Sequence, residues 1–233
     1  MHTVCVQAIP SELRLAYTPR AQNGPGKPSM PQAKSARLVV LAAGQGSNLQ
    51  AIYDAIARAE LAAEVVLVVS HRADAHALVR AQQHGSATAV NTLAAVKQAG
   101  GARQDFDHWL TQTVLAAKPD LVVCAGWMLI LGSPFLETFA GRAINLHPAL
   151  PGAFVGKDAI GQAWIAGERG DVWETGVMVH EVIAEMDAGA PIEVAHVPLI
   201  RGESMENLTL RIHAVEHRVL VTAIRKKLGQ QTI

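Results

Sequence analysis

The fold is decided by the stretch Arg37-Leu38-Val39-Val40-Leu41-Ala42-Ala43-Gly44-Gln45-Gly46-Ser47-Asn48-Leu49-Gln50. After the arginine, residues 38–43 are all apolar, which predicts a strand buried on both faces. The two glycines then allow a tight turn, and an apolar period over residues 48–59 predicts a helix. A buried strand that passes through a glycine-containing loop into a helix is the first unit of an α/β sheet.

The same alternation continues along the chain. We predict further strands at residues 64–70, 87–91, 120–126 and 143–147, and helices at residues 73–84, 103–117 and 133–140. Nearly continuous Val and Leu strands between helices are typical of a parallel sheet covered on both faces.

The pattern changes after residue 147. Residues 174–183 and 192–199 alternate in polarity on either side of a turn at residues 189–191, and residues 203–228 predict a final helix. We therefore predict an α/β fold: an open, doubly wound, mostly parallel, Rossmann-like sheet with an antiparallel extension in the C-terminal half.

Composition excludes several classes of protein. Half of the 233 residues are hydrophobic, which excludes wholesale disorder, and the formal net charge is zero, which argues against nucleic-acid partners. Two cysteines cannot form a disulfide framework. The longest apolar stretch, residues 121–132, is shorter than the roughly 20 residues of a membrane span. We expect a cytoplasmic protein with no membrane or nucleic-acid partner.

The first 36 residues differ from the rest. They hold five of the 11 prolines, and their four basic residues outnumber a single acid. An organellar targeting segment is one interpretation, but no amphipathic helix supports it, and a loosely structured extension is the other. We expect an extension at residues 1–36, one domain at 37–229 and a tail at 230–233.

The loop at residues 44–48 has two interpretations: a phosphate site at a helix N-terminus, or only a tight turn between strand and helix. Ser47 and Gln50 fit a capping box that would start the helix. The third glycine of a dinucleotide fingerprint is absent, with Leu49 in its place, and the lysine of a P-loop is missing. A monophosphate is therefore the ligand we expect.

Polar residues gather in the second half. Asn145 and His147 lie two residues apart at the end of a predicted strand, so their side chains point the same way. An amide beside an imidazole can stabilise an oxyanion and handle its proton. His180 and Asp187 form a second candidate pair. A structural role for His147 stays open, and Asp187 has a catalytic role only if the fold brings it near His147.

One motif is misleading. His213-Ala214-Val215-Glu216-His217 matches the pattern of inverted zinc proteases. Such a site needs a third ligand downstream, and no Asp, Glu, His or Cys follows His217. We therefore expect no metal site.

Together these motifs resemble the phosphoribosylglycinamide formyltransferase family. The resemblance rests on residues 44–50, on Asn145-Leu146-His147-Pro148 and on His180 with Asp187, and it runs from about Arg37 to Leu228. The stretches at residues 124–132 and 146–152 resemble its monofunctional fungal branch. The resemblance implies formyl transfer from 10-formyltetrahydrofolate to the amine of glycinamide ribonucleotide (GAR) in purine biosynthesis, with no metal and with a homodimer as a possible assembly.

The resemblance also assigns residues. It implies that Asn145, His147 and Asp187 are catalytic, that His180 lies near them, and that Asp187 raises the pKa of His147. Gly46, Ser47, Asn48 and Glu216 would bind GAR. The folate site would be lined by Arg103, Met128, Leu129, Ile130, Leu131, Asn145, Ile183, Ala184, Glu185, Met186 and Asp187.

Two positions depart from the family pattern: Ala43 replaces a usual serine, and Val155 replaces an acid in the loop at residues 153–158. The alternatives are a formyltetrahydrofolate hydrolase, which would usually carry a regulatory domain in front, and a methionyl-tRNA formyltransferase, which would need a basic second domain. A nucleotide-binding module without catalysis would leave Asn145, His147 and Asp187 unexplained.

Overall fold

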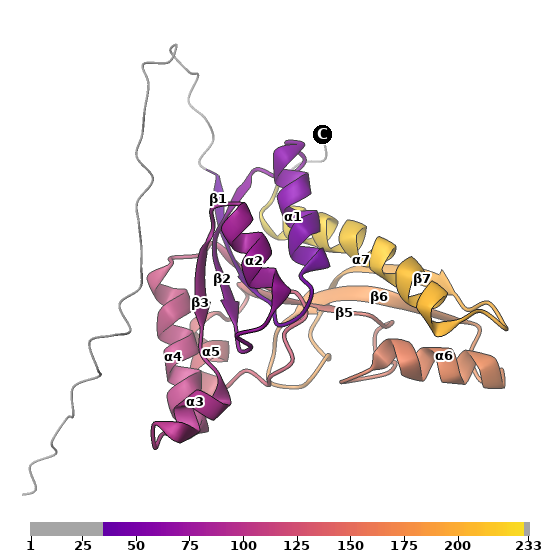
Figure 1. Cartoon of the computed structure of the whole chain (residues 1–233). Coiled ribbons are helices and arrows are strands. Elements are labelled where there is room, and N and C mark those ends of the chain that lie inside the picture. The colour runs from indigo at the N-terminus through magenta and orange to yellow at the C-terminus, as the bar shows by residue number, and fades with distance from the viewer. Residues whose placement is uncertain (1–34, 231–233) are drawn as a thin grey trace, which may run out of the picture. The chain divides into compact units, whose positions relative to one another are not determined.

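The computed structural model describes residues 35–230 (Figure 1). The predicted extension therefore lies outside the described residues except for Ser35 and Ala36, and so do the last three residues of the tail. The described part alternates strands and helices: β1 (Ala36–Leu41), α1 (Ser47–Ala57), β2 (Ala63–Ser70), α2 (His76–Gln83), β3 (Ala87–Val90), α3 (Leu93–Gln98), α4 (Arg103–Ala116), β4 (Leu121–Cys124), α5 (Ser133–Thr138), β5 (Ala143–His147), α6 (Ala159–Arg169), β6 (Glu174–Glu181), β7 (Pro191–Pro198) and α7 (Met205–Lys227).

The strands form one sheet in the order β3-β2-β1-β4-β5-β6-β7. The pairs among β1 to β5 are parallel, whereas β6 and β7 pair antiparallel. This confirms the predicted doubly wound sheet with an antiparallel extension. The chain moves outward from β1 to β3 and then returns to β4 on the other side of β1. Ligands of such sheets bind at this reversal, outside the carboxyl ends of the strands.

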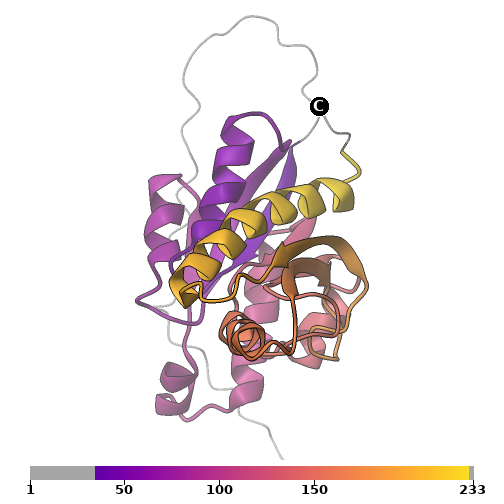
Figure 2. The same cartoon turned by 90° about the vertical axis from the view of Figure 1, so that its right-hand side faces the viewer.

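The sheet is buried on both faces because its strand residues alternate between two apolar clusters. Leu38 and Val40 pack with α1, α2 and α7, while Val39 and Leu41 pack with α4 and α5. Figure 2 shows α7, in yellow, running along one face of the sheet. Although α7 has 23 residues, neither it nor any other helix within residues 35–230 is long and apolar enough to cross a membrane.

Two helices were not predicted, α3 and α6. Helix α3 has only six residues and is preceded by Thr92, whose side chain caps it by accepting a hydrogen bond from the Ala95 N–H. Helix α6 contains Gly161 and Gly167, which lower helix propensity. A Cβ at residue 167 would lie 3.0 Å from Leu199 Cδ1, so glycine lets α6 pack closely there.

The predicted capping box at the start of α1 is wrong. The residue before the helix is Gly46, in the left-handed conformation with φ 73°, and no side chain caps the helix. The Gln50 side chain instead contacts Arg80 and Asp54. A Cβ at residue 46 would lie 2.8 Å from the Ala77 Cα of α2, so glycine is required by both backbone conformation and close packing.

We therefore expect Gly46→Ala to lower the free energy of unfolding by about 2–4 kcal/mol, through left-handed strain and overpacking against α2. Urea denaturation measures this change. Gly44→Ala is the matched control, because a Cβ there would meet nothing within 4 Å. Equal losses in the two variants would contradict the packing argument.

Candidate active site

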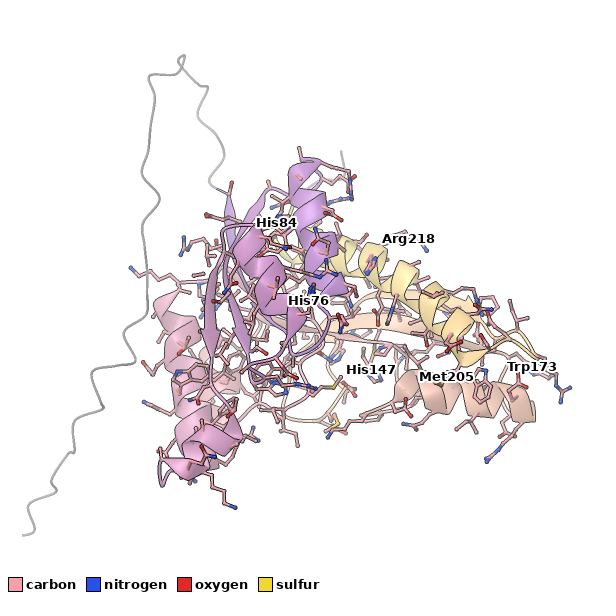
Figure 3. All side chains as sticks on the ribbon, in the orientation of Figure 1. His76, His84, His147, Trp173, Met205 and Arg218 are labelled. Atoms are coloured by element: carbon pink, nitrogen blue, oxygen red, sulfur yellow. The ribbon has the colours of Figure 1, made fainter. Side chains whose placement is uncertain are left out.

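A cavity of about 710 Å³ opens at the carboxyl ends of β1, β4 and β5. Its walls come from the start of α1, from residues 126–131 after β4, from residues 145–148 at the end of β5, from residues 156–160 and from residues 182–187. The cavity thus lies where the strand order reverses, the position expected for a ligand site in this fold. Figure 3 labels His147, one of the residues that line it.

The predicted polar residues meet in this cavity. Asn145 pairs with His180 across β5 and β6, and His147 lies two residues further along β5, so the three side chains share one face of the sheet. Asp187 follows β6 in a loop. Its carboxylate oxygens lie 3.5 Å from His147 Nδ1, 3.6 Å from His180 Nε2 and 3.4 Å from Asn145 Nδ2. The fold therefore satisfies the condition that Asp187 lies near His147.

The backbone holds Asp187 in place. Its own φ is 54°, a left-handed conformation rare for a residue other than glycine. The Gly156 N–H donates to Asp187 Oδ2 at 2.9 Å. At residue 189 a Cβ would lie 1.7 Å from the Glu181 carbonyl oxygen, so the turn is closed tightly against β6. Strained backbone of this kind is common at functional sites, where the surrounding structure fixes it.

The acceptors around Asn145 fix its orientation. A carboxylate only accepts hydrogen bonds, so the amide nitrogen of Asn145 faces Asp187. His180 Nδ1 lies 2.9 Å from the Glu181 carbonyl oxygen and therefore carries a hydrogen. In neutral His180 the other nitrogen, Nε2, accepts from Asn145 Nδ2 at 3.1 Å. Asn145 thus directs its donors at His180 and Asp187.

His147 lies between two acceptors. Its Nε2 is 3.2 Å from the Phe154 carbonyl oxygen, while Nδ1 faces Asp187. Both contacts are hydrogen bonds only when the imidazole is protonated on both nitrogens. Burial nevertheless lowers the pKa of His147 below its usual value. The negative charge of Asp187 and the Phe154 carbonyl oxygen oppose this shift and raise the pKa, whereas the charge of His180 lowers it. Asp187 acts in the direction we expected, but burial outweighs it.

The pKa of Asp187 shifts downward. Burial raises this pKa, but the contacts from His180 and the Gly156 N–H, together with the charges of His147 and His180, lower it by a larger amount. Asp187 is therefore ionised at neutral pH and supplies a fixed negative charge beside His147.

The other end of the cavity holds the loop before α1. Asn48 Nδ2 donates to Glu216 Oε2 of α7 at 2.9 Å, so residues far apart in the sequence are joined here. Glu216 is only 5% exposed, and burial raises its pKa against the Asn48 hydrogen bond and the His213 charge, which lower it. Ser47, Asn48 and Glu216 line the cavity, whereas Gly46 shapes the turn without lining it.

The segments predicted to bind folate also line the cavity. Arg103 of α4 donates to the Ile130 carbonyl oxygen and pairs with Asp107 at 2.9 Å, so it holds the segment after β4. Met128 and Ile130 are 60% and 67% exposed, which leaves apolar side chains available to a flat ligand. The cavity is lined by each of the predicted residues Arg103, Met128, Leu129, Ile130, Leu131, Ile183, Ala184, Glu185, Met186 and Asp187.

Sequence reasoning missed several lining residues, including His213, Trp127, Lys157 and Asp158. In the sequence, His213 stands out only as part of the zinc-protease motif. Its position three residues before Glu216 on α7 places both on one helix face, and that spacing could have revealed it. In the described part of the chain, no group of three or more His, Cys, Asp or Glu side chains is arranged to hold a metal ion.

A buried histidine–carboxylate–amide cluster in an α/β cleft is typical of an enzyme that moves a proton and stabilises an oxyanion. The chain belongs to the formyl transferase family, whose characteristic sequence matches residues 36–224. Phosphoribosylglycinamide formyltransferases are among its relatives. The one from Schizosaccharomyces pombe is 46% identical over 82% of this chain and 96% of its own length, and that from Saccharomyces cerevisiae is 40% identical over 84% and 98%.

A solved structure agrees with these relatives. Glycinamide ribonucleotide transformylase 1 from Geobacillus kaustophilus has a TM-score of 0.77 and 39% identity, covering 84% of this chain and all of that one. The resemblance inferred from the sequence motifs, including that to the fungal relatives, is confirmed.

The contact between Asp187 and His147 predicts how the pKa of His147 responds when the carboxylate is removed. Asp187→Asn removes the negative charge that raises the pKa of His147, so the titration midpoint of His147 should fall. NMR of the imidazole protons measures this midpoint in the free protein, and the signal missing from His147→Gln assigns it. An unchanged or higher midpoint would show that Asp187 does not stabilise the cation.

Proposed function

We propose that this protein transfers the formyl group of 10-formyltetrahydrofolate to the amine of GAR, a step of purine biosynthesis. The observation that carries the proposal is one cavity that extends from Ser47 and Asn48 at the start of α1, past Asn145, His147 and Asp187, to the apolar residues 128–131. Relatives that carry the name phosphoribosylglycinamide formyltransferase support the same reaction. Membership of the family implies a folate-derived formyl donor and small-molecule substrates.

The two ends of the cavity suit the two substrates. The turn at Gly46, Ser47 and Asn48 receives the GAR phosphate, because the first N–H groups of α1 have no partner within the helix. Glu216 is placed beside Asn48 to accept from a ribose hydroxyl. The folate lies between the segments at residues 128–131 and 183–187, with Arg103 at the rim.

The reaction needs an oxyanion site and a proton route. The GAR amine nitrogen forms a bond to the formyl carbon, and the tetrahedral intermediate carries a negative oxygen. Asn145 and protonated His147 stabilise this oxygen. The 3.4 Å contact from Asn145 to Asp187 is long, so the amide hydrogen is readily redirected to the oxyanion.

Collapse of the intermediate breaks the bond between the formyl carbon and the folate nitrogen. The proton lost by the amine passes to that nitrogen through water held by Asp187. The oxyanion also favours the imidazolium form of His147, since a negative charge raises the pKa of a neighbouring histidine. No metal enters this chemistry. A homodimer and a cytoplasmic location remain predictions.

The function is tested by following release of the spectroscopically distinct deformylated product from a 10-formyl-dideazafolate, with and without GAR. We expect release that depends on GAR. Equal release in its absence would indicate a formyltetrahydrofolate hydrolase. No release, with GAR binding intact, would indicate a binding module without catalysis.

His147→Ala should lower kcat about 10²–10³-fold, because one donor to the oxyanion is lost, while KM for GAR changes little. Steady-state kinetics measure both. His108→Ala, at an exposed histidine of α4, is the control for loss of an imidazole. Turnover near that of the control would show that His147 does not stabilise the oxyanion.

A further inference from the structure

Helix α2 contacts the glycine loop from behind. The Ala77 N–H donates to the Gly44 carbonyl oxygen at 3.1 Å, and Arg80 Nε donates to the Gln45 carbonyl oxygen at 2.9 Å. Between these two contacts Gly46 packs directly on Ala77. His76 and His84 mark the two ends of α2 in Figure 3, and His84 stacks on Tyr53 of α1 with ring centroids 4.0 Å apart.

These contacts set the direction of the loop peptides. In a trans peptide the carbonyl and the following N–H point in opposite directions. Because α2 binds the carbonyls of Gly44 and Gln45, the N–H groups of Gln45 and Gly46 point away from α2. Within residues 35–230 neither N–H donates a hydrogen bond to the protein. The loop therefore presents donors on the side opposite α2.

Arg80 also connects the loop to the helix that follows. Its Nη1 donates to Gln50 Oε1 at 3.1 Å, and Gln50 Nε2 donates to Asp54 Oδ1 at 2.9 Å. One guanidinium thus bridges the residue before the turn and the first turn of α1. Across the described residues Arg80 forms no ion pair with a carboxylate, so its acceptors are neutral oxygens and its positive charge is not neutralised.

We propose that Arg80 is a positioning residue for the phosphate loop: it holds the Gln45 carbonyl away from the ligand and adds positive charge behind the loop. The inference rests on the proposed function, since it concerns the GAR phosphate. Arg80 acts through the loop peptides and lies outside the lining of the cavity.

The test compares Arg80→Gln, Arg80→Lys and Arg58→Gln. Arg58 lies at the other end of α1, paired with Glu60, so its replacement removes the same charge without touching the loop. We expect Arg80→Gln to raise KM for GAR about tenfold, with kcat within about twofold and KM for the formyl donor unchanged. Arg80→Lys keeps the charge and should fall between Arg80→Gln and the unaltered protein.

A second measurement does not depend on turnover. Inorganic phosphate should raise the Tm of the unaltered protein and of Arg58→Gln more than that of Arg80→Gln. At a given concentration, a ligand stabilises the folded protein more when its affinity for that protein is higher. A purely structural role would lower the Tm of Arg80→Gln without phosphate and leave the phosphate response intact.

The outcomes separate the two proposals. Equal KM for GAR and equal phosphate stabilisation in Arg80→Gln and Arg58→Gln would overturn the role of Arg80, whatever the activity of the protein. Absence of GAR-dependent transfer in the unaltered protein would overturn the proposed function, while the phosphate comparison would still decide whether Arg80 positions an anion site.

Discussion

The site depends on one constraint: a buried carboxylate is stable only when its oxygens have hydrogen-bond or charged partners. The Asp187 side chain is 9% exposed, and its neighbours come from three parts of the chain. Asn145 and His147 come from β5, His180 from β6, and the Gly156 N–H from the loop before α6. The contacts of the Asp187 carboxylate therefore connect the β5–β6 strand pair with the two loops that enclose the cavity.

The same burial sets the charge state of the free site. It lowers the pKa of His147 although Asp187 raises it, so burial favours the neutral imidazole in the free protein. Two acceptors, the Asp187 carboxylate and the Phe154 carbonyl, face that histidine and favour the cation, and a developing oxyanion would add a second negative charge. The arrangement is suited to a reaction in which negative charge appears only in the intermediate, because the imidazolium is then favoured at the moment it is needed.

The strands could be predicted from the sequence because a short apolar run between two amphipathic helical segments is compatible with few structures other than a buried strand. The spacing of Asn145 and His147 on a strand placed their side chains together, but Asp187 could be added to them only through family resemblance, since the turn that returns it to β5 depends on backbone conformations that no periodicity shows. Helix α6 was missed because its glycines reduce propensity while permitting tight packing on Leu199. The predicted capping box was wrong because Gly46, in the left-handed conformation, is the residue before the helix, so Ser47 already lies in α1, and the Gln50 side chain contacts Arg80 instead. The pKa of His147 required burial, which is a tertiary property.

The pairing of Asn145 with His180 across β5 and β6 has a consequence for folding. A slip of β6 by one residue would turn His180 to the opposite face of the sheet and carry the Asp187 loop with it. Such a slipped chain would keep most of its helices and its parallel strands, and spectroscopic measures of secondary structure would barely distinguish it. With the roles proposed for Asn145, His147 and Asp187, activity depends on the register of the antiparallel edge, and recovery of activity after refolding would time the pairing of β6 separately from collapse of the core.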